Sequence, residues 1–139
     1  MYYKCLSNKS YLIENLELRA LDMNSIEYVR KIRNSQIDIL RQDKLISKNK
    51  QKKYFEEHVW NDMGTKPKNI LLAIYRDQLL IGYGGLVHIS WVDKRAELSF
   101  IIDKKISNFE KEKIQLCFIK QIKKIFFKEL KMNKIFTET

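Results

Sequence analysis

The sequence predicts an α/β (α+β) fold in which a mixed, mainly antiparallel sheet is flanked by helices. The chain has 139 residues, of which 45% are hydrophobic and 12% aromatic, and this composition suits one folded domain over residues 1–139. One Pro and four Gly are too few for a turn-dense β-sandwich and favour long helices. Stretches with a two-residue apolar period also alternate with stretches of helical period.

The first half of the chain is expected to form one strand followed by two helices. Residues 11–20 alternate loosely between apolar and polar side chains, which predicts a strand. Asp22 or Ser25 can cap a first helix, and Ser47 can cap a second helix that continues to about Met63.

The second half is expected to form an antiparallel meander, a crossover helix and one more strand. Residues 70–75, 79–89 and 96–103 are rich in strand formers and are separated by polar turns. Residues 109–131 change to the helical period, and residues 134–139 have the pattern of a strand that has just begun. A crossover helix places that last strand parallel to the last strand of the meander, so the sheet is mixed.

The chain is strongly basic, with 27 Lys and Arg against 17 Asp and Glu and a formal net charge of +10. This charge suits nucleic acid, a membrane surface or a phosphorylated small molecule, and Lys-rich codon usage explains it without any partner. Phe118, Phe126 and Phe127 are expected mainly on the apolar side of their helix, away from its lysines. This arrangement argues against nucleic acid, which needs aromatic side chains among the basic ones.

The sequence also indicates where the protein works. No apolar run is long enough to span a bilayer, and the first residues lack a secretory apolar core. Cys5 and Cys117 lack a metal or redox spacing. A reduced cytoplasmic protein with no membrane contact and no metal site is expected.

Three strings of the sequence resemble the GNAT-type acyltransferases, which transfer an acetyl group from acetyl-CoA to an amine. They are Ile32-Arg33-Asn34, Leu40-Arg41-Gln42, and residues 81–101, which read IGYGGLVHISW and continue into KRAELSFI. The resemblance spans nearly the whole chain. Within the family, the sequence resembles a bacterial subgroup whose members modify sugars or ribosomal proteins.

The resemblance implies the GNAT fold without its last helix and strands, because family members continue beyond the strand that begins at Lys134. It implies an N-acetyltransferase with acetyl-CoA as co-substrate and a primary amine of a small molecule as acceptor, such as an amino sugar of surface-polysaccharide biosynthesis. The alternative is a catalytically silent protein of the same fold that binds a partner or dimerises. The glycine-rich loop that holds the CoA diphosphate in the family is replaced here by residues 107–112, which contain no glycine.

The resemblance also indicates candidate binding residues. For the acyl acceptor they are Arg33, Asn34, Arg41 and Gln42. For the pantetheine arm of CoA they are the backbone groups of Phe100, Ile101 and Ile102. For the CoA phosphates they are Lys105, Ser107, Asn108, Lys111 and Lys113.

Glu97 and His88 are the candidate bases that take a proton from the acceptor ammonium group. The resemblance puts Glu97 on the strand where many GNAT enzymes carry this base. A structural carboxylate paired with Arg95 or a lysine is the alternative for Glu97, and a hydrogen-bonded structural residue is the alternative for His88. The glycines at positions 82, 84 and 85 lie inside an apolar strand and indicate a bulge or close packing, not a phosphate loop.

A homo-oligomer is the last expectation. Without the final elements of the family, part of the apolar stripe on the helix over residues 109–131 would stay uncovered. Large exposed apolar patches favour association.

Overall fold

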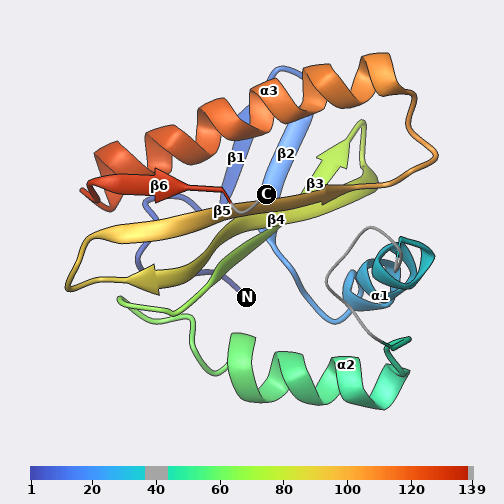
Figure 1. Ribbon diagram of the computed structural model, residues 1–139, viewed down its shortest axis with the longest axis horizontal. Coiled ribbons are helices and arrows are strands. Elements are labelled where there is room, and N and C mark those ends of the chain that lie inside the picture. Colours follow the sequence, from blue (N-terminus) through green and yellow to red (C-terminus); the bar gives the residue numbers. More distant parts are fainter. Residues whose placement is uncertain (37–43, 138–139) are drawn as a thin grey trace.

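A computed structural model describes residues 1–36 and 44–137, and it contains a six-stranded sheet with helices on both faces (Figure 1). The strand order is β1-β2-β3-β4-β5-β6. The strands are β1 (Ser10–Ile13), β2 (Leu16–Ala20), β3 (Ile70–Arg76), β4 (Leu79–Ser90), β5 (Arg95–Ile102) and β6 (Lys134–Phe136). All neighbours are antiparallel except β5 and β6, which are parallel. The predicted mixed sheet, with a meander and one crossover, is confirmed.

Residues 11–20 form a hairpin and not the single strand that their alternation predicts. Ile13 pairs with Leu16, and Glu14 in the two-residue turn has a left-handed backbone with φ 53°. A turn at this position usually carries Gly, Asn or Asp because φ is positive there. The core-facing side chains also change from odd to even positions across the turn, and a loose alternation conceals that change.

In the part of the chain that the structure describes, three α-helices pack on the sheet, and serine side chains cap the start of two of them. They are α1 (Ile26–Ser35), α2 (Lys48–Tyr54) and α3 (Asn108–Lys124). The Ser47 hydroxyl accepts a hydrogen bond from the Lys50 N–H at 3.2 Å, so the predicted cap is confirmed. Ser107 caps α3 in the same way. Two π-helical segments, η1 (Phe55–Val59) and η2 (Ile125–Glu129), continue α2 and α3.

The start of α1 and the end of the second helix differ in detail from the prediction. The carboxylate of Asp22 accepts hydrogen bonds from the N–H groups of Asn24 and Ser25 at 3.0 Å each. The Ser25 hydroxyl makes no cap to the helix. The second helical run ends with η1, before the predicted end at Met63. Asp22 therefore orders the turn that leads into α1.

The sheet separates two hydrophobic cores, one on each face. In Figure 1, α3 runs along one face of the sheet, while α1 and α2 lie together on the other. Alternate residues of β5 contribute to different cores: Leu98 and Ile102 pack toward α3, and Ile101 packs toward α1 and α2. A strand buried on both faces is apolar at successive positions, as the end of β5 is at Phe100, Ile101 and Ile102.

The apolar stripe of α3 is covered by the sheet, so the reason given for an uncovered patch is wrong. Its core positions are almost fully buried, from 0% to 3% exposed: Ile114, Phe118, Ile122, Ile125 and Phe126. Phe127 is 43% exposed and does not lie on the apolar side, contrary to expectation. The sheet of this chain is wide enough to cover the apolar side of α3. No helix among the described residues has the length and apolarity that a membrane crossing needs.

Candidate functional site

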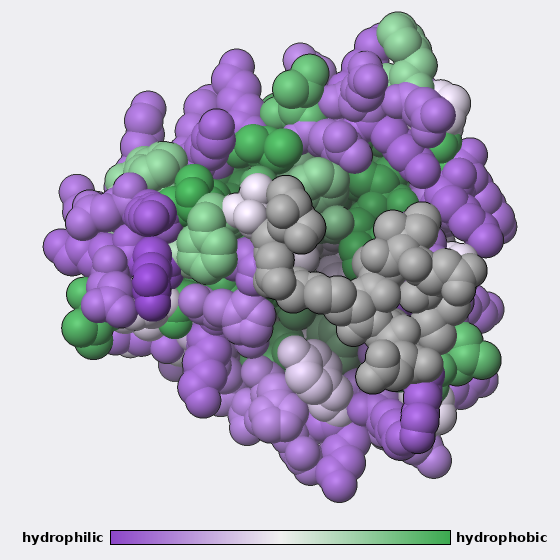
Figure 2. Space-filling model, viewed as in Figure 1, coloured by the Kyte–Doolittle hydropathy of each residue, from purple (hydrophilic) through white to green (hydrophobic). Residues whose placement is uncertain are grey.

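A cavity of about 500 Å³ lies between α1, α2 and the sheet. Its walls come from α1 (Val29, Arg33), the segment before α2 (Lys44, Leu45, Ile46), α2 and η1 (Lys50, Gln51, Tyr54, Phe55) and the sheet (Leu71, Tyr83, Gly84, Val87, Ser99). Figure 2 shows hydrophilic side chains around the rim of this face, with hydrophobic side chains in its middle. Its size and mixed lining are those of a small-molecule site.

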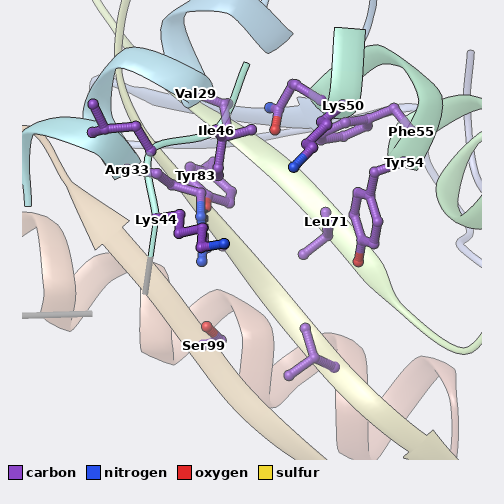
Figure 3. A pocket seen from close by; sticks show the side chains of 14 residues that line it. Val29, Arg33, Lys44, Ile46, Lys50, Tyr54, Phe55, Leu71, Tyr83 and Ser99 are labelled. Atoms are coloured by element: carbon purple, nitrogen blue, oxygen red, sulfur yellow. Dashed lines mark hydrogen bonds between the residues drawn. The ribbon is translucent and has the colours of Figure 1, made fainter. Parts of the chain in front are cut away.

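The predicted acceptor residue Arg33 lies in this cavity. Its guanidinium Nη1 donates a hydrogen bond of 2.9 Å to the hydroxyl of Tyr83, a buried residue of β4. Burial raises the pKa of Tyr83, and the nearby Arg33 charge partly opposes this. Tyr83 therefore presents a neutral hydroxyl that fixes the position of Arg33 above the sheet (Figure 3).

Asn34 holds the cavity wall in place. Its side-chain amide donates to the Ile46 carbonyl at 3.0 Å and accepts from the Ile46 N–H at 2.8 Å. Arg30 donates a further hydrogen bond to the same carbonyl at 3.0 Å. These bonds attach the segment before α2 to α1, which is a structural task. The other two predicted acceptor residues, Arg41 and Gln42, lie outside the described residues.

Glu97 and His88 are brought together on the cavity side of the sheet. His88 Nε2 lies 3.6 Å from Glu97 Oε2. The Glu97 side chain is 6% exposed and that of His88 is 75% exposed, so the pair joins a buried carboxylate to the surface. Glu97 is directly opposite Val87, which lines the cavity. The candidate base is thus next to the cavity, on the same sheet face.

A β-bulge in β4 turns His88 toward Glu97. Val87 pairs with Glu97 and Ser90 pairs with Arg95, so two residues of β4 oppose one residue of β5. His88 has a left-handed φ of 50°, and its N–H donates to the Asn69 side chain at 3.3 Å. The bulge therefore decides on which side of the sheet the His88 side chain lies.

The glycines of β4 allow close contact between neighbouring strands, as the sequence indicates. A Cβ atom added to Gly84 would meet the Ser99 carbonyl oxygen, and one on Gly85 would meet the Ile70 carbonyl oxygen. Gly85 also has φ +152°. These positions lie within the sheet and not at a helix start, so they are not a phosphate loop.

The family model of the acetyltransferase (GNAT) domain matches residues 18–139, which include the sheet from within β2 onward and the helices α1, α2 and α3. The chain belongs to the GNAT acetyltransferase family. The search of curated proteins found no match.

Solved structures show the same fold for this GNAT domain. A spermidine N-acetyltransferase from Vibrio cholerae, in complex with CoA and spermine, aligns with a TM-score of 0.75 and 18% identity, over 90% of this chain and 71% of that one. A dodecameric structure of spermidine N-acetyltransferase from the same organism aligns with a TM-score of 0.72 and 19% identity, over 90% and 70% of the two chains. The GNAT fold predicted from the sequence is therefore confirmed.

The predicted pantetheine contacts lie on the β5 edge of the GNAT sheet, but they are not equivalent. The Asp103 N–H bonds to the Ile81 carbonyl of β4 at 2.8 Å. Because backbone groups of a strand point alternately to its two sides, those of Ile101 also face β4, and those of Phe100 and Ile102 face the opposite edge. Within the described residues, β6 pairs only with Arg95–Glu97, beyond which that edge is open to a ligand. Gln36 donates to the Ile102 carbonyl at 3.1 Å, which leaves Phe100 as the better placed of the three.

The predicted phosphate contacts gather around the start of α3, with one exception. The first helical bond runs from the Lys111 N–H to the Ser107 carbonyl at 2.8 Å, so the N–H of Asn108 precedes the helical pattern. Lys105 lies in the loop just before it, and its N–H donates to the Asp103 carboxylate at 3.0 Å. Lys113 lies apart, at a second cavity of about 240 Å³.

Glu110, in the first turn of α3, forms an ion pair with a cationic side chain of the sheet. Its carboxylate accepts a hydrogen bond from Arg76 of β3 at 3.2 Å. The Asp103 carboxylate also has a hydrogen-bond partner, because the hydroxyl of Tyr28 donates to it at 2.6 Å. Burial raises the pKa of Asp103, but the hydrogen bonds and nearby lysines outweigh this and lower it overall.

Sequence reasoning missed several cavity residues. Lys50 is exposed on the lysine-rich helix α2 and also lines the cavity. Lys44 and Tyr54 line it too, and Tyr83 was considered only as part of a strand. Tyr54 at the end of α2 and Phe55 at the start of η1 could have been found, because they are apolar positions of this helical run. Among the described residues, no three His, Cys, Asp or Glu side chains are grouped as a metal site.

Proposed function

We propose that this protein transfers an acetyl group from acetyl-CoA to a primary amine of a small molecule bound in the cavity between α1, α2 and the sheet. The observation that carries the proposal is the buried Glu97 carboxylate beside that cavity, with His88 at 3.6 Å. An amine attacks a carbonyl only after its ammonium form has lost a proton, and a positioned carboxylate can accept that proton.

The two residues have different tasks in this proposal. Glu97 takes the proton from the acceptor, because its side chain is buried next to the cavity-lining Val87. His88 is mostly exposed and passes the proton on to water. The bulge that orients His88 thus completes a path from the buried carboxylate to solvent.

The residues at the β5 edge and the α3 start fit acetyl-CoA as the co-substrate. Acetyl-CoA supplies an acetyl group activated as a thioester. The backbone of Phe100 is available to its pantetheine arm, and the N–H groups at the start of α3 with Lys105 and Lys111 suit its phosphates. Arg76 holds Glu110 in an ion pair, which reduces repulsion of the diphosphate.

An amino sugar is the acceptor class that we propose. Its support is the resemblance of residues 81–101 to the sugar-modifying bacterial subgroup. The solved relatives include enzymes named for spermidine, and at 18% identity they share the fold of this chain. Acceptor amines of both kinds require the same proton removal, so Glu97 has the same role with either.

The test is acetyl transfer from acetyl-CoA to glucosamine by the wild type and by Glu97→Gln. We expect kcat to fall by about 10²-fold or more in the variant, because Gln cannot accept the proton. Equal melting temperatures would show that the fold is intact. Glu56→Gln is the control, because Glu56 is exposed on η1 and does not line the cavity.

Unchanged kcat in Glu97→Gln would refute its role as base. No transfer by the wild type, with acetyl-CoA still bound in calorimetry, would favour the catalytically silent alternative. His88→Gln should lower kcat by about tenfold, a smaller loss because Glu97 remains in place.

A further inference from the structure

We infer that Tyr28 and Asp103 are positioning residues for acetyl-CoA, because together they hold the loop between β5 and α3 against α1. The co-substrate phosphates are proposed to bind where this loop meets α3. The inference rests on the proposed function, since it names residues that prepare the co-substrate site of that same reaction. It goes beyond that function by giving a task to two residues outside the contacts proposed for acetyl-CoA and the acceptor.

The contact to the loop is made by one side of α1. The Tyr28 hydroxyl donates to the Asp103 carboxylate at 2.6 Å, and the Gln36 side chain, directly after α1, donates to the Ile102 carbonyl at 3.1 Å. Residues 28 and 36 are about two helical turns apart, so they lie on the same side of the helix. Figure 1 shows α1 at the end of the sheet where the chain passes from β5 to α3. Helix α1 is therefore attached to two successive residues at the end of β5.

The Asp103 side chain connects α1 to the backbone of the loop. Its two carboxylate oxygens have different partners: Oδ2 accepts from the Tyr28 hydroxyl at 2.6 Å, and Oδ1 accepts from the Lys105 N–H at 3.0 Å. The Asp103 backbone is bound as well, because its N–H donates to the Ile81 carbonyl at 2.8 Å and its carbonyl accepts from the Ile106 N–H at 3.0 Å. Tyr28 thus fixes a side chain that itself orders the backbone leading to α3.

The charge of Asp103 does not explain its place beside a phosphate site. Burial raises the pKa of Asp103, but the hydrogen bonds and nearby lysines lower it overall, so the carboxylate is ionised at neutral pH. A negative charge near bound phosphates weakens their binding by Coulomb repulsion. The hydrogen bonds of Asp103 act in the opposite direction, because a loop that is already ordered loses less entropy when it binds a ligand. The two effects predict opposite results when the Asp103 side chain is removed.

Helix α1 also places this loop relative to the acceptor. Val29, which follows Tyr28, and Arg33 line the cavity proposed for the acceptor. The same helix therefore contacts the acceptor cavity and the co-substrate loop. Group transfer requires the two reactants at a suitable distance and orientation, and a shared rigid element helps to supply both.

Titration calorimetry of CoA with the full chain tests the role of Tyr28, under conditions where every variant is folded. Tyr28→Phe removes the hydroxyl without changing any charge, and it should weaken CoA binding by about fivefold, the scale of one hydrogen bond. Tyr11→Phe is the matched control, because the Tyr11 hydroxyl also donates to a carboxylate, that of Glu129, at 2.7 Å. That bond joins β1 to η2, away from the loop, so its loss should leave the CoA affinity unchanged.

Two substitutions of Asp103 separate position from charge. Asp103→Ala removes the charge and both side-chain hydrogen bonds, and it should weaken CoA binding by about fivefold or more despite the lost repulsion. Asp103→Asn removes the charge but keeps both contacts, because its amide can accept from the Lys105 N–H and donate to the Tyr28 oxygen. This variant should bind CoA at least as tightly as the wild type.

Amide hydrogen exchange, measured by NMR without any ligand, reports on the order of the loop itself. The N–H groups of Lys105 and Ile106 both donate to Asp103. They should exchange faster in Tyr28→Phe than in the wild type, and at the wild-type rate in Tyr11→Phe.

Unchanged CoA affinity or unchanged loop exchange in Tyr28→Phe would overturn the inference, as would equal losses of affinity in Tyr28→Phe and Tyr11→Phe. Tighter CoA binding by Asp103→Ala would also overturn it, because charge would then outweigh position. In each of these results the wild type still binds CoA, so the proposed function stands. Absence of CoA binding by the wild type would instead reject the proposed co-substrate, and this inference with it.

Discussion

The bulge at His88 shows how one backbone irregularity can assemble a candidate site. Without it, Val87 and His88 would point to opposite faces of the sheet, and the imidazole would lie away from Glu97. With it, His88 Nε2 and Glu97 Oε2 are 3.6 Å apart. The left-handed φ of 50° at His88 is unusual for a residue with a side chain and occurs here beside the proposed base.

Gly84 is a residue where a single added methyl group should disturb both the sheet and the cavity. A Cβ at Gly84 would meet the backbone oxygen of Ser99, so β4 and β5 would have to separate. We expect Gly84→Ala to lower the free energy of unfolding by about 1–3 kcal/mol or more, as overpacking does. Gly64→Ala is the control, because nothing lies within 4 Å of its added Cβ. Equal stability of the two variants in urea denaturation would contradict this packing argument.

The hydrogen bond from Tyr28 to Asp103 should make stability depend on acid pH. The pKa of Asp103 is lowered in the folded protein, so its ionised form stabilises the fold above the unfolded pKa of about 3.9 and this contribution is lost as pH falls through the folded value. Tyr28→Phe should cost about 1–2 kcal/mol at pH 7 and progressively less below about pH 4.

Denaturant unfolding of the wild type and Tyr28→Phe at several pH values measures this effect. Tyr2→Phe is the control, since Tyr2 is 44% exposed and donates no hydrogen bond to a carboxylate in the described structure. A Tyr28→Phe loss that stays constant from pH 7 to pH 3 would show that the bond to ionised Asp103 is not its cause.

Helix α3 separates buried from exposed apolar residues more sharply than its composition suggests. Phe118 is 0% exposed and contacts Phe100 of β5 edge to face, at 5.8 Å between ring centroids, while Leu116 is 70% exposed. Phe118→Ala should cost about 3–5 kcal/mol through the cavity it leaves, and Leu116→Ala should change stability by less than about 0.5 kcal/mol. Thermal and urea unfolding of the two variants measure this difference. A comparable loss in both would mean that Leu116 is covered by a partner in solution.

At the element scale the sequence predicted most helices and strands, and its errors have local causes. Ser47 and Ser107 begin helices as capping rules require. The hairpin turn at Glu14 was missed because it contains no glycine and its left-handed residue is Glu. The place of Lys50 at the cavity was missed because the sequence shows which residues share a helix face, but not which neighbour that face meets.

The whole molecule should unfold in one step, because both cores share the central strands. Trp60 packs against the α1–α2 core and Trp91 against the α3 core, so each reports on one face of the sheet. We expect Trp60→Phe and Trp91→Phe, each with one remaining Trp, to show fluorescence midpoints equal to their own circular dichroism midpoints. Separate midpoints for the two probes in either variant would contradict a single domain over residues 1–139.

Homo-oligomerisation stays a prediction, although the reason given for it has changed. The α3 stripe is buried in the chain itself and needs no partner. The open edge of β5 beyond Glu97, as far as the described residues show it, is the remaining feature that favours association, because unpaired strand edges can pair with another chain. Light scattering over a concentration series measures the oligomeric state.

The sequence by itself determined the fold class, the meander with its crossover helix, and the candidacy of Glu97, because these depend on local periodicity, capping and a family string. Only the tertiary structure decided which residues meet. It brought Arg33, Lys44 and Lys50 around one cavity and paired Glu110 with Arg76. The physical reason is that a side chain's partners come from strand register and helix packing, which join segments far apart in the chain.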